Sequence, residues 1–322
     1  MNGTVARIAL LALLLPAAPP APAQGWPSKP IRLIVPFPAG ATTDFLARVV
    51  ADKIGPALGQ TVVVENRAGA AGNVGTDLVA KSAPDGYTVV MGTVAQTISE
   101  TLYTKLPFSI QRDLAPVALV ARVPNVMEVH PSVPAKTVKE YIALARARPG
   151  QITFVSGGSG TSVHMSGEML KMMTGIDIVH VPYKGAAPAL VDLVGGHVMS
   201  MFDNLPSSMP HIRSGRLRAL AVTIAQRYAA LPDLPTVAEA GVPGYEASSW
   251  FGILGPAAMP REALARLNAE VNRAIRLPDV QERLAQEGAI VAPISPEEFG
   301  AFIRTEVAKW AKVVKASGAK AD

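Results

Sequence analysis

Four short loops rich in glycine and hydroxyl residues each follow an apolar, strand-like segment and precede a helix-like one. They span residues 36–44, 92–96, 156–162 and 182–187. Backbone amides at the start of a helix have no partner inside the helix, and the helix dipole places partial positive charge there. Such positions bind anions. The four loops together predict an anion site, although any one of them is also compatible with an ordinary helix cap.

Hydroxyl side chains in these loops supply further hydrogen-bond donors for a carboxylate. They belong to Thr42, Thr43, Ser159, Thr161 and Ser162. Each charge-assisted hydrogen bond contributes about 1.5–3 kcal/mol, so three or four of them support binding in the micromolar range. Thr93, in the second loop, is a further candidate ligand-binding residue.

Two acidic residues beside these loops allow two interpretations each. Asp44 either lies in the wall of the anion site or belongs to the first turn of its own helix. Asp203 follows a strand-like segment and either accepts a hydrogen bond from a ligand or caps the turn after it.

Catalytic chemistry has weaker support. The stretch from Gly157 to Thr161 resembles the G-x-S-x-G nucleophile elbow, but Thr161 stands where the last glycine belongs. A serine hydrolase using Ser159 and His164 is therefore the enzymatic alternative. The sequence as a whole favours a protein that is not an enzyme.

No cofactor, metal or nucleic-acid partner is expected. Gly69, Gly72 and Gly75 lack the G-x-G-x-x-G spacing of a dinucleotide site, and the five histidines lack metal-ligand spacing. The chain has no cysteine, which excludes disulfides and thiolate metal sites. The net charge of +5 comes from scattered basic residues without interleaved aromatic residues.

The elements that must position the loops indicate an α/β protein. Strands are predicted at residues 31–35, 61–64, 87–91, 151–155, 177–181, 197–202 and 218–223. Strands that alternate with helices favour mainly parallel sheets with helices on their faces. The alternation restarts after Pro124, so we expect a first lobe at 24–124 and a second lobe at 125–248. The mainly helical segment 249–322 is expected to return chiefly to the first lobe.

The N-terminal residues have the features of a secretory signal peptide. Arg7 is followed by the apolar run 8–15, and Ala21-Pro22-Ala23 fits an A-x-A cleavage site. The run is far shorter than the ~20 residues needed to span a bilayer. We therefore expect residues 1–23 to be removed near Ala23, releasing a soluble chain. Its 49% hydrophobic and 17% charged residues are typical of a packed globular protein.

Several longer strings resemble the Bug-type extracytoplasmic solute receptors, the substrate-binding proteins of tripartite tricarboxylate transporters. The matching strings are Ile34 to Gly40 with Thr43-Asp44, Val64 to Asn73, Ser82 to Thr88, His180 to Gly185, Met201 to Asn204 and Leu234 to Glu239. The resemblance covers nearly the whole mature chain. It implies a two-lobed periplasmic-binding-protein (flytrap) fold that captures a small carboxylate for a membrane permease.

The resemblance also implies a set of ligand-binding residues on two facing walls. One wall consists of Phe37, Ala39, Gly40, Thr43 and Asp44, and the other of Gly158, Ser159, Thr161, Ser162, His164, Tyr183 and Asp203. The chain departs from the family pattern at Ala41, where a glycine is usual, at Ser159, where asparagine is common, and at 94–97. Family members bind di- and tricarboxylates, acidic amino acids or aromatic acids, so the resemblance leaves the ligand open.

Two further expectations concern partners. The chain is expected to act as a monomer that delivers its ligand to a tripartite tricarboxylate-type permease. The alternative role is a periplasmic sensor that signals ligand binding to a membrane partner, because uptake and sensing use the same cleft.

Overall fold

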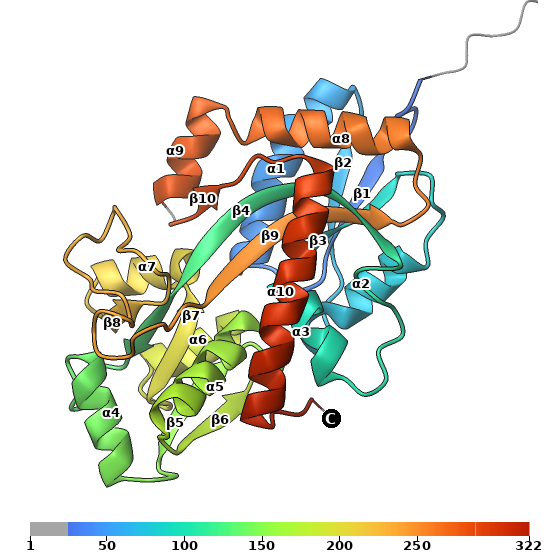
Figure 1. Cartoon of the computed structure of the whole chain (residues 1–322). Coiled ribbons are helices and arrows are strands. Elements are labelled where there is room, and N and C mark those ends of the chain that lie inside the picture. The colour runs from blue at the N-terminus through green and yellow to red at the C-terminus, as the bar shows by residue number, and fades with distance from the viewer. Residues whose placement is uncertain (1–24, 287, 322) are drawn as a thin grey trace, which may run out of the picture.

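The computed structural model describes residues 25–286 and 288–321, and the predicted signal segment 1–23 lies outside them (Figure 1). The strands are β1 (Ile31–Val35), β2 (Val62–Asn66), β3 (Thr88–Thr93), β4 (Leu114–Val129), β5 (Ile152–Ser156), β6 (Ile178–Pro182), β7 (Ser200–Asn204), β8 (Arg218–Val222), β9 (Ser248–Pro256) and β10 (Ile290–Val291).

The helices lie between and after these strands, and most of them follow a strand directly. They are α1 (Thr42–Leu58), the short 3₁₀ helix η1 (Ala70–Gly72), α2 (Asn73–Ala80), α3 (Val94–Leu102), α4 (Val138–Ala147), α5 (Ser162–Thr174), α6 (Ala186–Val194), α7 (Leu205–Arg213), α8 (Arg261–Ala274), α9 (Pro278–Gln286) and α10 (Pro296–Ser317). None of the helices in the described part of the chain has the length and apolar character needed to cross a membrane.

The strands form one curled sheet with the order β2-β1-β3-β9-β4-β7-β5-β6. β1 pairs in parallel with β2 and β3, and β5 pairs in parallel with β6 and β7. The pairs β3–β9, β9–β4 and β4–β7 at the centre are antiparallel. Two parallel groups of strands therefore flank an antiparallel centre.

The sixteen-residue strand β4 crosses the whole molecule beside β9 (Figure 1). Its residues 114–124 pair with β9, and its residues 125–129 pair with β7 and β8. We call β1, β2, β3 and β9, with residues 114–124 of β4, the first half of the sheet. The second half consists of β5, β6, β7 and β8 with residues 125–129 of β4, and each of the helices α1, α3, α5, α6 and α7 is assigned to the half that contains the strand before it. The lobe boundaries stay a prediction, but the change of partner shows where the chain passes from one half to the other.

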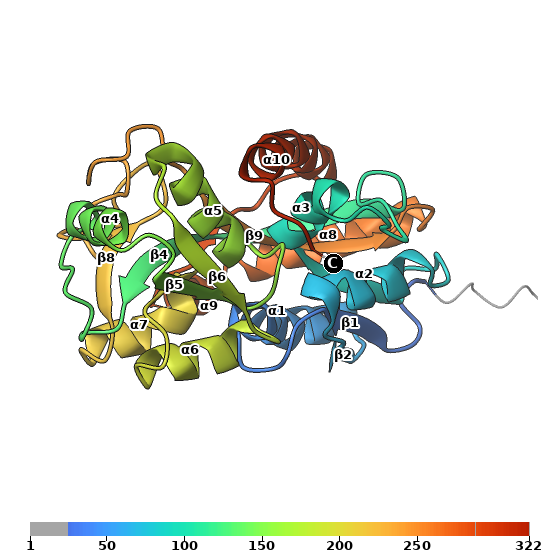
Figure 2. The same cartoon turned by 90° about the horizontal axis from the view of Figure 1, so that it is seen from below.

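Helices cover both faces of the sheet. On one face, α1 and α8 pack over β1, β4 and β9, and their buried Val50, Ile54, Leu267 and Val271 belong to one apolar cluster. On the other face, α10 packs against α3 of the first half and α5 of the second (Figure 2). The final segment of the chain therefore contacts both halves.

Candidate ligand-binding site

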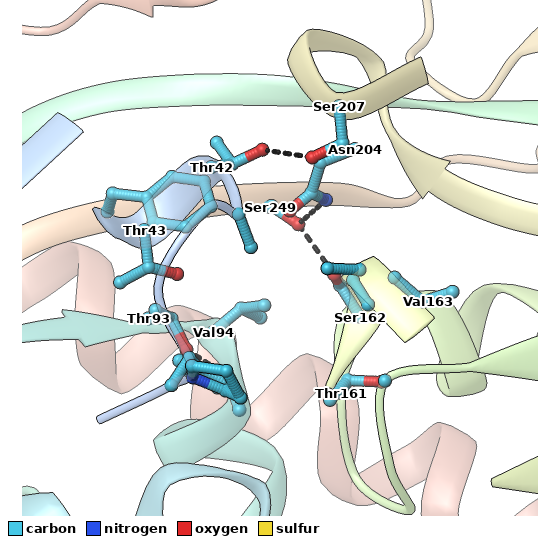
Figure 3. A pocket seen from close by; sticks show the side chains of 18 residues that line it. Thr42, Thr43, Thr93, Val94, Thr161, Ser162, Val163, Asn204, Ser207 and Ser249 are labelled. Carbon is cyan, nitrogen blue, oxygen red and sulfur yellow. Dashed lines mark hydrogen bonds between the residues drawn. The ribbon is translucent and has the colours of Figure 1, made fainter. Parts of the chain in front are cut away.

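A cavity lies where the two halves meet, with about 600 Å³ of empty space that includes its open mouth (Figure 3). We call it the central cavity. Most of its lining comes from the first turns of five helices. These turns contribute Ala41, Thr42 and Thr43 from α1, Thr93, Val94 and Ala95 from α3, Thr161, Ser162 and Val163 from α5, Ala186 and Ala187 from α6, and Asn204 and Ser207 from α7.

Capping residues in the local sequence determine where these helices begin. Thr93 caps α3, because its hydroxyl accepts the amide of Ala95 while Gln96 accepts the amide of Thr93. Thr161 caps α5 by accepting the amide of His164. Gly185 precedes α6 with a φ of 121°, a conformation that favours glycine. Five strands, β1, β3, β5, β6 and β7, are thus each followed by a helix that begins at the cavity.

The cavity attracts anions through dipoles and not through charged side chains. Among the described residues, no Asp, Glu, Lys, Arg or His lines it. The first amides of each helix lack an intrahelical partner, and five helix dipoles place partial positive charge around one space. A carboxylate fits this environment. The described residues also contain no group of three or more metal-ligating side chains.

Hydrogen bonds between side chains fix the walls of the cavity. The Ser162 and Ser249 hydroxyl oxygens lie 2.6 Å apart, and Ser249 donates to the Asn125 amide oxygen at 3.1 Å. The Asn204 amide nitrogen donates to Ser249 and to Asn125, both at 2.7 Å. Ser249 on β9 belongs to the first half of the sheet and Ser162 to the second, so this network joins the halves behind the cavity.

A second space, which we call the side chamber, adjoins the central cavity and shares Phe37, Pro38 and Gly157 with it. It has about 1250 Å³ of empty space, including open solvent. Residues 68–72 form one wall, and residues 157–159 and 182–185 form the other. Ala70 and Ala71 have φ values of 46° and 52°, an uncommon conformation for residues other than glycine.

The residues predicted from the sequence fall into four groups. Phe37, Thr43, Thr93, Thr161 and Ser162 line the central cavity. Gly158, Ser159 and Tyr183 line the side chamber, and Gly40 lines a neighbouring groove formed mainly by α6 and α7. Ala39, Asp44, His164 and Asp203 line none of these spaces.

Asp44 holds its own loop in place. Its carboxylate accepts hydrogen bonds from Arg48, from the Gly40 amide and from Asn66. Burial by itself would raise the pKa of Asp44, but these hydrogen bonds outweigh it and the pKa lies below its ordinary value. The carboxylate therefore stays ionised and braces the loop before α1, as the first-turn interpretation predicted.

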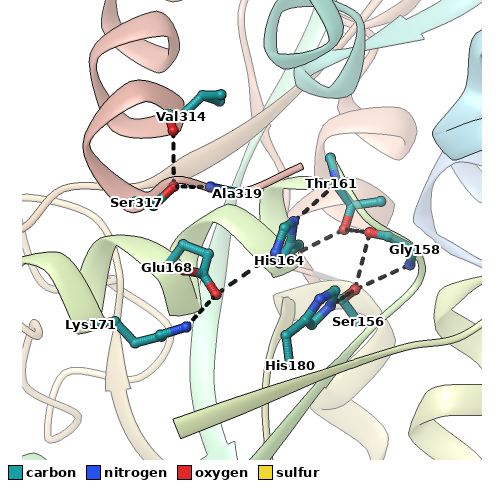
Figure 4. A network of polar contacts seen from close by, with 11 residues as sticks. Ser156, Gly158, Thr161, His164, Glu168, Lys171, His180, Val314, Ser317 and Ala319 are labelled. Carbon is teal, nitrogen blue, oxygen red and sulfur yellow. Dashed lines mark hydrogen bonds and ion pairs between the residues drawn. The ribbon is translucent and has the colours of Figure 1, made fainter. Parts of the chain in front are cut away.

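His164 lies beneath the loop 156–160 (Figure 4). Its Nδ1 accepts the Gly160 amide at 3.1 Å, and its ring stacks on His180 with 3.9 Å between centroids. Burial lowers the pKa of His164 to about 3 and that of His180 to about 4. The serine that contacts a histidine here is Ser156, whose hydroxyl lies 2.6 Å from Nε2 of His180. Among the described residues, no hydrogen bond joins Ser159 to His164, which the hydrolase alternative requires.

Asp203 turns away from the cavity into the second half of the sheet. It lies beside Glu128 of β4, and the Ser208 hydroxyl is 2.7 Å from Glu128 and 3.4 Å from Asp203. Burial raises the pKa of Asp203 to about 7 and, together with the charge of Asp203, raises the pKa of Glu128 well above its usual range. The neighbouring Asn204 lines the cavity in place of Asp203.

Sequence reasoning missed several residues of the cavity. They are Asn204, Ser207, Ser249 and Phe251, with Asn125 behind them. Asn204 had a detectable signal, because an Asn directly before Leu-Pro at the end of a strand marks a helix start. Ser249 and Asn125 had none, since they reach the cavity only through the pairing of β4 and β9.

Comparison with known proteins places this chain in one family. The model of the tripartite tricarboxylate transporter family receptor matches residues 46–319. Rpa4515 of R. palustris, solved with adipate, is 40% identical with a TM-score of 0.88, over 91% of this chain and 98% of its own. The periplasmic binding protein BugD is 34% identical with a TM-score of 0.87, over 92% and 99%.

MatC (Rpa3494) from Rhodopseudomonas palustris, solved with bound malate, is 31% identical with a TM-score of 0.86, over 90% of this chain and 100% of its own. The expected α/β binding-protein fold and the Bug-type resemblance are both confirmed. The chain belongs to the tripartite tricarboxylate transporter receptor family of periplasmic solute receptors, which is a family of binding proteins and not of enzymes.

Proposed function

We propose that this chain captures a small carboxylate in the central cavity and delivers it to a tripartite tricarboxylate-type membrane permease. The observation that carries the proposal is the convergence of five helix starts, from both halves of the sheet, on one cavity without charged side chains. Adipate and malate, bound by Rpa4515 and MatC, are both carboxylates, which supports an acid as the ligand. We propose uptake rather than signalling because the matching family is a transporter receptor.

Capture by a cavity between two halves requires the halves to open and close. We propose that lobes 24–124 and 125–248, with 249–322 returning mainly to the first, move about β4 and β9. In support, β4 changes partner between Pro124 and Asn125, and β9 begins at Ser248. The protein is proposed to act in the periplasm as a monomer after cleavage near Ala23.

A ligand panel tests the proposal directly. Protein purified from the periplasm is unfolded and refolded to remove any retained ligand, and its melting temperature is measured with mono-, di- and tricarboxylic acids. A bound acid raises the melting temperature because it stabilises only the folded state. The amide derivative of each acid, which has the same body without the charge, is the control and should have no effect. If no acid at millimolar concentration raises the melting temperature, the proposal is wrong.

A further inference from the structure

The polar side chains around the central cavity have few protons left to donate. Each hydroxyl has a single proton. Ser249 donates its proton to Asn125, and Ser162 therefore donates to Ser249. Thr93 donates to Gln96, and Thr161 donates to the Gly158 carbonyl. All four of these hydroxyl protons are engaged inside the protein.

The remaining side-chain donors lie close together. The Asn204 amide gives hydrogen bonds to Asn125 and Ser249. Thr42 and Ser207 share one hydrogen bond, so that pair retains one proton. The Thr43 hydroxyl is the other donor and points into the cavity (Figure 3). Both available protons thus lie at the first turn of α1 and the facing turn of α7. Together with backbone amides, they suit one carboxylate.

The rest of the lining is apolar and comes from several elements. Phe37 precedes α1, Val94 begins α3, Val163 lies in the first turn of α5, and Phe251 lies on β9. Val94, Val163 and Phe251 are buried. A second carboxylate among these side chains would lose water without finding a free hydroxyl donor, because the hydroxyl protons of Thr93, Thr161 and Ser162 are already engaged, and this loss is costly. Lys184 is an exposed cation in the wall of the adjoining side chamber.

We propose that the ligand of this site is a monocarboxylic acid with a small apolar body. Its carboxylate binds at the first turn of α1, and its body contacts Phe37, Val94, Val163 and Phe251. This inference rests on the proposed function, because it names the class of acid that the central cavity selects.

Calorimetry on refolded protein tests the proposal with benzoate and phenylacetate against malate, adipate and citrate. One of the two monocarboxylates should bind at least tenfold more tightly than every di- or tricarboxylate, and Lys184→Ala should leave its affinity unchanged. The inference is wrong if the preference for a monocarboxylate is less than tenfold, or if a dicarboxylate binds most tightly and depends on Lys184. Either result is still compatible with the proposed capture of a carboxylate. Absence of binding by all five acids overturns the proposed function as well.

A matched pair of variants gives an independent measurement. Val163→Thr keeps the shape of the side chain and adds one hydroxyl donor to the apolar wall. The preferred monocarboxylate should bind at least threefold more weakly, because its body then displaces water from a polar group. Val63→Thr makes the same change at an exposed position of β2 and should have no effect. If Val163→Thr leaves monocarboxylate affinity unchanged, the apolar body does not lie against α5 and the inference is wrong.

Discussion

The hydroxyl oxygens of Thr42 and Ser207 lie 2.9 Å apart, although the two residues are 165 positions apart in the chain. Thr42 begins α1 in the first half of the sheet, and Ser207 lies in the first turn of α7 in the second half. Ser207 also lines the groove formed mainly by α6 and α7, which contains Gly40 and His211. The bond therefore joins the two halves and separates the central cavity from that groove.

A double-mutant cycle measures this bond. Thr42→Val and Ser207→Ala should each weaken ligand binding about 2- to 10-fold, because the closed form loses a hydrogen bond worth about 0.5–1.5 kcal/mol. The double variant also removes the one proton that the pair retains for the ligand, so it should bind more weakly than either single variant. Calorimetry provides the four affinities. Ser214→Ala is the control, because the Ser214 hydroxyl bonds only Pro210, His211 and Arg216 at the far end of α7. Unchanged affinity in both single variants would show that the bond does not stabilise closure.

Asn204 offers a test of the anion site that keeps side-chain size constant. Asn204→Asp replaces the amide that holds Ser249 and Asn125 with a carboxylate at the start of α7. Because that carboxylate repels an anion and competes for the helix amides, affinity for the acid should fall more than tenfold. Asn268→Asp makes the same change in α8, where Asn268 bonds Val117 and Ile294. It should alter stability without altering affinity. Equal affinity losses in both variants would contradict the site.

Gly157 tests how closely the walls approach each other. A Cβ atom at Gly157 would lie 2.7 Å from the backbone nitrogen of Ala186, at the start of α6. Gly157→Ala must therefore displace α6, which should reduce ligand affinity and cost about 1–3 kcal/mol of stability. Gly300→Ala, inside α10, meets no atom closer than 3.5 Å and should stabilise the protein by about 0.5–1 kcal/mol. Urea unfolding and calorimetry measure both. Unchanged affinity in Gly157→Ala would remove that contact from the site.

Two buried pairs of titratable side chains, Asp203 with Glu128 and His164 with His180, make the stability of the protein depend on pH in opposite directions. The pKa of Asp203 is about 7 in the folded protein against 3.8 ordinarily, so its contribution to stability falls as pH rises through that window. The pKa values of His164 and His180 are about 3 and 4 against 6.5, so their contribution falls as pH drops below 6.5. Each group changes the free energy of unfolding by at most about 1.4 kcal/mol per pH unit.

Replacing Asp203 removes one of the two opposing pH dependences, so that the effect of the histidines on stability becomes measurable. Asp203→Asn should lose more stability than the unmodified protein when the pH falls from 6.5 to 5, by up to about 2 kcal/mol, because the histidine effect is then less opposed. The free energy of unfolding in urea at the two pH values measures the difference. Asp177→Asn, at an exposed carboxylate, is the control and should follow the unmodified protein. If the free energy of unfolding of Asp203→Asn and of the unmodified protein changes equally between pH 6.5 and 5, Asp203 is not the opposing group.

The sequence by itself determined where the helices at the site begin. All four glycine- and hydroxyl-rich loops precede a helix in the structure, namely α1, α3, α5 and α6. Thr93 and Thr161 cap two of them. These features were predictable because a cap depends on residues within three or four positions of it.

Tertiary structure decided which side chains meet at the cavity. The sequence predicted neither β4 nor β9. Pro116 and Pro124 interrupt the apolar pattern of β4, and β9 lies in a segment that is interpreted as mainly helical. The pairing of these strands brings Asn125, Ser249 and Asn204 together. It also turns Asp203 toward Glu128. Contacts between residues a hundred positions apart depend on strand pairing and packing, which local sequence patterns do not specify.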